Sequence, residues 1–370
     1  MAAPTTEATT AVEAVDAADA HPLVARVRRY ADDVLRPSAL RTDREGVTAR
    51  RIAELADLGL LNHLAPPQYG GQVVDRGVDR RLHEIVAGAC FNTWLVWAQH
   101  APLAGRLSEA LAQGRPLPAV AERVLRGEIL LGAGISDVRR YPDHHIAATR
   151  VPGGWTFDGT ISWVSGWGLS SALTVAAVER ATETVVTALV VVGDRTRVAA
   201  PLRLAAVAGS RTERVRLDEV FVPDEQVLSA KTLAQTRFED LGTASDARGH
   251  HFGLAATVLD ELARSPHPLA HAVADTWRPR VAQTRARAYA LSDEAAAVGG
   301  GPHRIDERLA TKVASGEALS TLTRALVVAR SGRGLADDDT AQLHARSALF
   351  VLVQGQSADV RHAQLTHLAQ

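Results

Sequence analysis

The spacing of apolar residues changes twice along this chain, and these changes limit the folds open to it. Before about residue 127, apolar residues such as Leu23 and Val27 recur at three- and four-residue intervals, which is typical of amphipathic helices. Over residues 128–228, Val and Thr dominate, and apolar residues alternate with polar ones between Gly and Pro turns, which indicates β-strands. Helical spacing then returns, for example at Leu309 and Val313.

This order predicts an α+β chain in which a sheet is a separate middle domain between two helical parts. We expect a disordered tail over 1–20, an N-terminal helical domain over 21–127, a middle β-domain over 128–228 and a C-terminal helical domain over 229–370. Within the middle domain, segments 145–151 and 155–164 flank the turn-forming residues 152–154 and predict a β-hairpin.

Composition excludes several classes of protein. The chain has 370 residues, 46% of them hydrophobic, and its formal net charge is −1, so it lacks the basic excess of proteins that bind nucleic acids or anionic membranes. Its single cysteine, Cys90, rules out an internal disulfide and a zinc site of several thiolates. No signal sequence and no apolar run of about 18 residues is evident. We expect a cytoplasmic protein that acts on a small molecule, without a metal.

Three motifs occur in a fixed order. The first is the turn Pro67–Gly71, the second is the strand Gly159–Ser165, and the third combines Ser331–Leu335, Arg346 and Val353–Gln356. In this order they resemble the acyl-CoA dehydrogenase superfamily, from about Arg28 to Arg361. The resemblance implies a middle β-barrel or sheet, a C-terminal four-helix bundle, a homo-oligomer (dimer or tetramer) and a bound FAD, although the sequence does not distinguish FAD from FMN.

The middle motif carries residues that suit a flavin. Trp163 and Ser165 are two residues apart on one predicted strand, so they share a face and offer an aromatic wall and a hydroxyl donor to the flat flavin ring. The plainer interpretation is a core tryptophan beside a turn serine. The resemblance adds Ser136, Gly332, Gly334 and Gln356 as flavin contacts, although a glycine triplet after a helix is often only a helix cap. The sequence has no glycine-rich turn between a predicted strand and a predicted helix, so it does not indicate a Rossmann nucleotide site.

The chain departs from the superfamily where the ordinary dehydrogenases carry their base. The glutamate that removes the α-proton of an acyl thioester aligns with Gln354, whose amide does not accept a proton at neutral pH. A second base position falls near Thr243 or Ala244, and neither is a base. The nearest titratable residues in the sequence are Asp246, His250 and His251. Ordinary fatty acyl-CoA oxidation is therefore disfavoured.

A second branch of the superfamily, the flavin-dependent monooxygenases, matches better at two places. Cys90–Trp94 with His100 is similar to one helix of that branch, and Trp163–Gly166 is similar to its flavin strand. These enzymes take reduced flavin from a reductase, react with O₂ and need no α-proton base. We therefore expect a monooxygenase-like enzyme for a small organic substrate, with His100, His250, His251 and Gln354 as candidate catalytic residues. For His100, a satisfied core histidine is the plainer alternative.

Two other hypotheses stay open. One is a dehydrogenase for thioesters of CoA or acyl-carrier protein that uses a non-standard base. The other is a family member that has lost its chemistry and serves as a binding subunit. The flavin spectrum of the purified protein separates all three.

Overall fold

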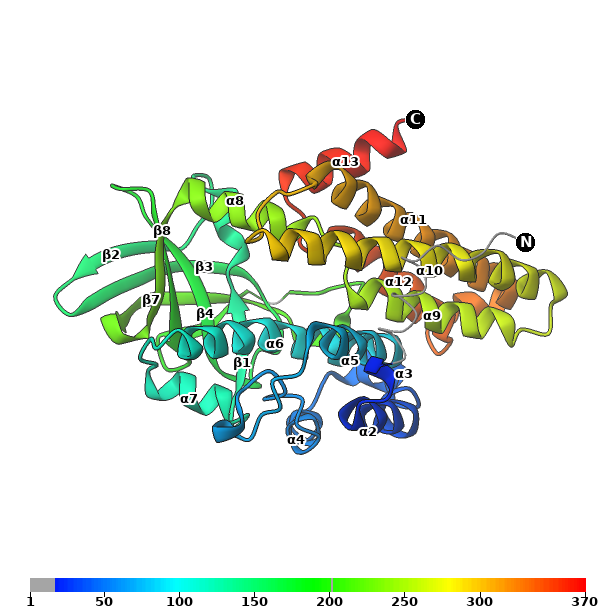
Figure 1. The fold of residues 1–370 in the computed structure, drawn as a ribbon, viewed down its shortest axis with the longest axis horizontal. Helices are drawn as coiled ribbons and strands as arrows, with labels where there is room; N and C mark the ends of the chain where they lie inside the picture. Colours follow the sequence, from blue (N-terminus) through cyan, green and yellow to red (C-terminus); the bar gives the residue numbers. More distant parts are fainter. Residues whose placement is uncertain (1–16, 201) are drawn as a thin grey trace.

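The computed structural model describes residues 17–200 and 202–370. Figure 1 shows a sheet at one end of the molecule, a group of C-terminal helices at the other, and N-terminal helices along one side of both. The predicted order of helices, sheet and helices is confirmed.

The N-terminal part is helical up to Leu125. Its elements are α2 (Pro22–Tyr30), η1 (Ala31–Leu35), α3 (Ala39–Glu45), α4 (Ala49–Asp57), η2 (Pro67–Tyr69), α5 (Arg76–Ala89), α6 (Phe91–Ala112) and α7 (Ala119–Leu125).

Of the expected N-terminal tail, residues 1–16 lie outside the described part of the chain. Residues 17–19 are helical, and the Asp19 carboxylate contacts Arg28 at 2.7 Å and Arg81 at 2.6 Å. These ion pairs hold the end of the segment against α2 and α5, so the structured chain begins before residue 20.

Among the described residues, the middle part forms one mixed sheet with eight strands. The strands are β1 (Leu130–Gly134), β2 (Ala147–Val151), β3 (Gly154–Val164), β4 (Ser170–Glu179), β5 (Thr184–Val191), β6 (Thr196–Ala200), β7 (Glu213–Pro223) and β8 (Val227–Thr232), with 3-10 turns η3 (Ser136–Arg140), η4 (Ala208–Ser210) and η5 (Asp224–Gln226) between them. Their order is β6-β7-β3-β2-β4-β5-β8, with β1 parallel to β4.

The predicted hairpin is present as β2 and β3. Val151 pairs with Gly154 across the turn, and Gly153 has a φ of +77°, which favours glycine because it has no Cβ. Phe157 and Ile161 on β3 and Val215 on the neighbouring β7 are fully buried in the core of the sheet domain. The alternation of apolar and polar residues in these strands therefore reflects a sheet with one face buried in the core.

The C-terminal part consists of α8 (Leu233–Ala244), α9 (Gly249–Ala263), α10 (Pro268–Ala297), α11 (Ile305–Arg330), η6 (Ser331–Leu335), α12 (Thr340–Val353) and α13 (Ala358–Leu368). Helices α9, α10, α11 and α12 pack as a bundle, with α11 in contact with the other three. Helix α8 lies between the sheet and this bundle in Figure 1.

Two glycines let helices α5 and α9 approach closely. A Cβ on Gly253 would lie 2.1 Å from the carbonyl oxygen of Glu84, and one on Gly88 would lie 2.6 Å from that of Gly253, so neither position tolerates a side chain without movement. This contact joins the N-terminal and C-terminal helices. It also positions α9 beside α6.

Candidate functional site

A pocket of about 220 Å³ lies where the three parts of the chain meet, and we call it the central pocket. Its wall comes from α6, the segment from β1 to η3, the end of α8 with the loop that follows it, α11, and the end of α12. Its volume is below the range of about 300–1,000 Å³ that is usual for pockets of drug-sized ligands, so it suits a small molecule.

The central pocket joins both positions at which the sequence comparison looked for a base. Gln354, the C-cap of α12, lines it from one side, and Thr243 and Ala244, at the end of α8, line it from another. Ile135, from the segment before η3, completes the wall. Residues far apart in sequence therefore meet in one pocket, and no carboxylate occupies either base position.

The charged lining of the central pocket is mainly basic. Arg106, Arg139, Arg248 and Lys312 line it together with one acid, Asp246. Arg139 is held by a bidentate ion pair with the Asp240 carboxylate, at 2.7 Å for each contact. An excess of positive charge in a small cleft attracts anions.

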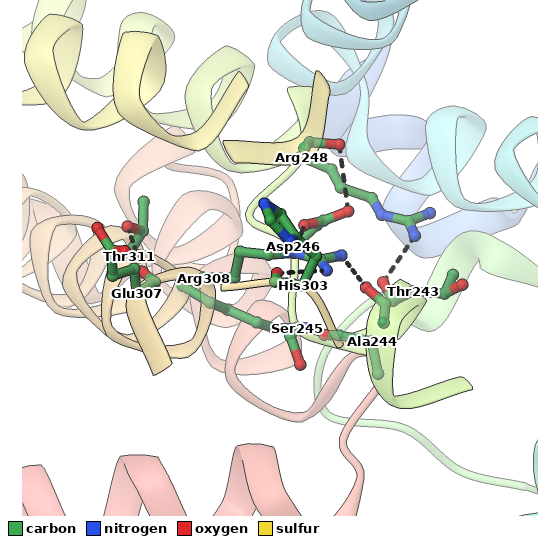
Figure 2. A network of polar contacts seen from close by, with 12 residues as sticks. Thr243, Ala244, Ser245, Asp246, Arg248, His303, Glu307, Arg308 and Thr311 are labelled. Carbon is green, nitrogen blue, oxygen red and sulfur yellow. Dashed lines mark hydrogen bonds and ion pairs between the residues drawn. The ribbon is translucent and has the colours of Figure 1, made fainter. Parts of the chain in front are cut away.

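Asp246 is part of a polar network that pins the loop after α8 to α11. Its Oδ1 accepts a hydrogen bond from Arg308 Nε at 2.8 Å, and the same guanidinium donates to the carbonyls of Gly242, Gly301 and His303. Figure 2 shows Arg308 between Asp246 and the end of α8, with the Arg248 guanidinium reaching toward Thr243. The network fixes this side of the central pocket.

Lys312 lies one helical turn after Arg308 on α11 and was not expected from the sequence. Its Nζ donates to the Ala244 carbonyl at 2.5 Å and lies 3.4 Å from the Gln354 carbonyl. Burial, followed by the charges of Arg248 and Arg139, lowers the pKa of its amine to about 7. This amine therefore changes protonation state near neutral pH. One signal was available: the chain has only two lysines among its 41 basic residues.

Comparison with known proteins supports the resemblance in the N-terminal part of the chain. Residues 18–113 match the family model "Acyl-CoA dehydrogenase, N-terminal domain". Over these residues the chain is similar to that family. No curated protein sequence matches it.

Several solved structures share the fold along nearly the whole chain at low sequence identity. Butyryl-CoA dehydrogenase from Megasphaera elsdenii has a TM-score of 0.77 at 15% identity, with 94% of this chain and 97% of that chain covered. FMN-bound TdsC from Paenibacillus sp. A11-2 has a TM-score of 0.77 at 16% identity, covering 92% and 96%. PigA with FAD and proline has a TM-score of 0.75 at 13% identity, covering 94% and 96%.

His100, which the likeness to the monooxygenase branch suggested as an acid, lies in the core. Its side chain is fully buried on α6, its Nε2 hydrogen-bonds to the Leu61 carbonyl at 2.6 Å, and its Nδ1 accepts the Leu131 N–H at 3.0 Å. Burial lowers its pKa to about 4, so the ring is neutral at pH 7. Both ring nitrogens are used to join α6 to β1, and the structure does not bring His100 into the central pocket.

His250 and His251 also lie behind the pocket wall. His251 Nδ1 accepts the Arg248 N–H at 3.2 Å, and burial, with the charge of Lys312, lowers its pKa to about 3. His250 stacks on Trp94 with ring centroids 4.2 Å apart, and burial holds its pKa well below the usual value. Neither residue lines the central pocket. Because both rings are neutral at pH 7, neither is a proton donor of ordinary strength there.

Trp163 and Ser165 lie between the sheet and the C-terminal helices. The Trp163 ring packs on Phe350 of α12, with centroids 6.0 Å apart and planes at 26°, and neither Trp163 nor Ser165 lines the central pocket. Ser165 Oγ accepts a hydrogen bond from Trp163 Nε1 at 3.2 Å and contacts Thr212 Oγ1 at 2.9 Å, which in turn contacts Ser210 Oγ at 2.7 Å.

This hydroxyl chain tests whether the residues suit the superfamily's cofactor. Ser165, Thr212 and Ser210 are buried, and each hydroxyl can donate or accept. When Ser210 donates to Thr212 and Thr212 donates to Ser165, one O–H is left at the Ser165 end beside the Trp163 ring. An aromatic wall with a hydroxyl donor beside it fits the edge of a flavin.

The remaining flavin-contact residues suggested by the resemblance lie on η3, on η6 and in the segment after α12. Ser136 begins η3, next to Ile135 of the central pocket, and Gln356 hydrogen-bonds to Gln364 at 3.1 Å. Gly332 is exposed, and a Cβ there would meet no atom within 4 Å, so its backbone is open to a ligand or another subunit. Gly334 is buried, and a Cβ there would lie 2.7 Å from the Val327 carbonyl oxygen, so the position has no room for a side chain.

Two further properties concern the described residues as a whole. Over residues 17–200 and 202–370, no helix combines the length and apolar character needed to cross a bilayer. Within the same residues, no three His, Cys, Asp or Glu side chains are grouped so that they could hold a metal ion.

Proposed function

We propose that this protein is a flavin-dependent oxidoreductase of the monooxygenase kind, which uses reduced flavin and O₂ to oxygenate a small anionic organic substrate. The observation that carries the proposal is the lining of the central pocket. Gln354, Thr243 and Ala244 fill both base positions with groups that do not ionise at neutral pH. A reaction that begins by removing an α-proton from carbon needs a carboxylate base at these positions, whereas oxygenation removes no such proton.

The charge of the central pocket supports an anionic substrate. Arg106, Arg139 and Arg248 can hold a carboxylate or phenolate, and a guanidinium offers two parallel donors to such a group. Apolar side chains such as Leu103 and Ile135 form the rest of the wall and exclude water from the bound molecule. The Gln354 amide can donate to the substrate without taking a proton from it.

Trp163, Ser165 and Ser136 are the residues that would hold a flavin, with Gly332, Gly334 and Gln356 as further contacts. A bound flavin would supply the electron transfer and the reaction with O₂ that amino-acid side chains do not provide. The related structures include one with FAD and one with FMN, so both cofactors belong in the test.

The proposal is tested by measuring the affinity of the purified protein for FAD and FMN, oxidised and reduced, in the absence of O₂. We expect the reduced form to bind more tightly, and a flavin reductase with NADH to support oxygenation. Ser165→Ala should weaken flavin binding about 2–10-fold, the value of one hydrogen bond. Ser171→Ala, on the exposed surface of β4, is the control and should leave the affinity unchanged. Absence of binding in both redox states would refute the proposal and favour a binding subunit.

A thioester dehydrogenase is the second candidate, and one observation favours it. The Lys312 amine lies beside the backbone of both base positions, where it could replace the missing carboxylate. In that case a saturated acyl-CoA should bleach the bound oxidised flavin rapidly without O₂ and without a reductase. That result would overturn the monooxygenase proposal.

A further inference from the structure

Lys312 is a buried amine without an opposite charge beside it. Its exposed fraction is 5%, and its contacts are the carbonyl oxygens of Ala244 and Gln354. Of the two lysines in the chain, only Lys231 forms an ion pair with a carboxylate of the described residues. The next basic residue on the same helix, Arg308, is equally buried but is paired with Asp246.

Stability does not explain this lysine. Moving an ammonium group out of water without a counter-charge is unfavourable, and an apolar residue of similar size would pack there at lower free energy. Ionisable groups that are buried, shifted in pKa and placed in a cleft are candidates for function. Lys312 meets all three conditions, because its amine lines the central pocket and has a pKa near neutrality.

The structure holds the amine at a defined point of the pocket wall. Ala244 ends α8 and Gln354 caps α12, so the Nζ atom bridges two helix ends that carry the base positions of the superfamily. Gly355 follows with a φ of +66°, and a Cβ there would lie 3.7 Å from Nζ. The glycine lets the chain turn away while the amine stays beside the pocket.

The groups around the amine set its charge. Arg248 and Arg139 favour the neutral amine, whereas Asp246 and Asp240 favour the ammonium. The ionisable groups that face this region from the packed elements are Arg106 on α6, Arg139 on η3, Asp240 on α8, Asp246 and Arg248 on the loop, His250 and His251 on α9, and Arg308 on α11. Since the carboxylates are paired with Arg139 and Arg308, the cations and burial prevail.

We infer that Lys312 is the base of the central pocket, and that its neutral amine takes a proton from an acidic O–H or N–H of the bound substrate. This inference rests on the proposed function and names the substrate class for that site. In the step, the O–H or N–H bond of the substrate breaks and an N–H bond forms at Nζ. The electron pair stays on the substrate, and the new ammonium remains beside the resulting anion.

The substrate class follows from what the proton transfer does. Ionising an O–H or N–H that is attached to an aromatic ring or a carbon–carbon double bond raises the electron density of that system. A richer ring or double bond reacts more readily with an electrophilic oxygen, which an oxygenase requires. The Lys312 ammonium and the Arg248 guanidinium then stabilise the anion in the pocket. A phenol or an enol of small size fits both the charge and the volume.

The first experiment follows the amine directly. Protein grown with [¹³C]lysine has two lysine Cε signals, and Lys231→Arg assigns them. In wild-type protein we expect the Lys312 signal to titrate with a midpoint near pH 7. A Lys312 signal that stays unchanged between pH 5.5 and 9, on the order of two units either side of neutrality, would overturn the inference.

The second experiment uses 4-nitrophenol, a small phenol whose anion alone is yellow, at pH 7, where a large share of the free phenol and of the Lys312 amines is neutral. We expect wild-type protein to deepen the yellow colour by binding the anion, and Lys312→Met to reduce that gain at least tenfold, whereas Lys231→Met, an exposed control, keeps it. Equal colour in wild type and Lys312→Met, or no binding to wild type, would overturn the inference. Thermal melting of each variant confirms that it is folded.

Neither experiment depends on flavin, so the two proposals can fail separately. A titrating Lys312 that ionises 4-nitrophenol in a protein without flavin affinity would remove the proposed function and leave the basic amine in place. A protein that binds reduced flavin but has a silent Lys312 would keep the proposed function and remove the base.

Discussion

Arg308 offers the sharpest test of how this site is held together. Its guanidinium is 4% exposed and pairs with Asp246, which is 11% exposed, while it also donates to three backbone carbonyls. In Arg308→Met the apolar stem is kept, but the Asp246 carboxylate and the carbonyls of Gly242, Gly301 and His303 lose their donor. Removing one partner of a buried ion pair typically destabilises a protein by about 3–5 kcal/mol.

The magnitude can be expressed as a melting temperature. With about 2.1 cal/mol/K of unfolding entropy per residue over the whole chain, a loss of about 3–5 kcal/mol lowers the melting temperature by about 4–6 °C. Differential scanning calorimetry at pH 7 measures this directly. The matched control is Arg278→Met, because Arg278 forms one ion pair, with Asp260, in which the side chains are 49% and 57% exposed. The control should change the melting temperature by about 1 °C or less.

The result that would refute this reasoning is an Arg308→Met protein that melts within about 1 °C of wild type, as the control does. A double variant, Arg308→Met with Asp246→Leu, adds a second check. It removes the unpaired carboxylate and should recover part of the lost stability, because apolar replacement of a whole buried pair is often close to neutral. A double variant less stable than Arg308→Met would contradict the assignment of the loss to that carboxylate.

Three other predictions follow from the structure. Gln354→Glu is nearly isosteric and should leave flavin affinity unchanged while adding slow flavin reduction by a saturated acyl-CoA; a general base is worth about 10²–10⁴-fold, and fast reduction by wild type would show that another residue is the base. Lys312→Met should raise the melting temperature relative to wild type at pH 7, and this gain should shrink as the pH rises from 7 to 10.5. The pKa of Lys312 is about 7 in the folded protein and 10.5 in the unfolded chain, so between these values the unfolded wild type binds one more proton and wild-type stability increases with pH. A gain in melting temperature that does not depend on pH would contradict the lowered pKa. Helices α11 to α13 expose Val328, Leu349 and Leu368 (73%, 62% and 66%), so light scattering at micromolar concentration should show a dimer or tetramer, and a monomer would refute the expected oligomer.

The sequence by itself determined the order of the elements. Helical spacing up to Leu125, alternation from Leu130 to Thr232 and helical spacing from Leu233 onward are local patterns, because each depends on which face of one helix or strand is buried. The hairpin at Gly153 and the absence of a carboxylate at position 354 could likewise be read from neighbouring residues.

The tertiary structure alone decided which polar groups are available for chemistry. His100 is a residue that often acts as a general acid, but both of its ring nitrogens form hydrogen bonds with the backbone of Leu61 and Leu131, which are 39 and 31 residues away in the chain. Lys312 sits in a helical pattern like any surface lysine, and it becomes a buried amine only because α8 and α12 end beside it. Burial and neighbouring charge set the pKa of a side chain, and both come from segments distant in sequence. That is why the sequence singled out position 354 and the end of α8 but not the amine that we propose as the base of the central pocket.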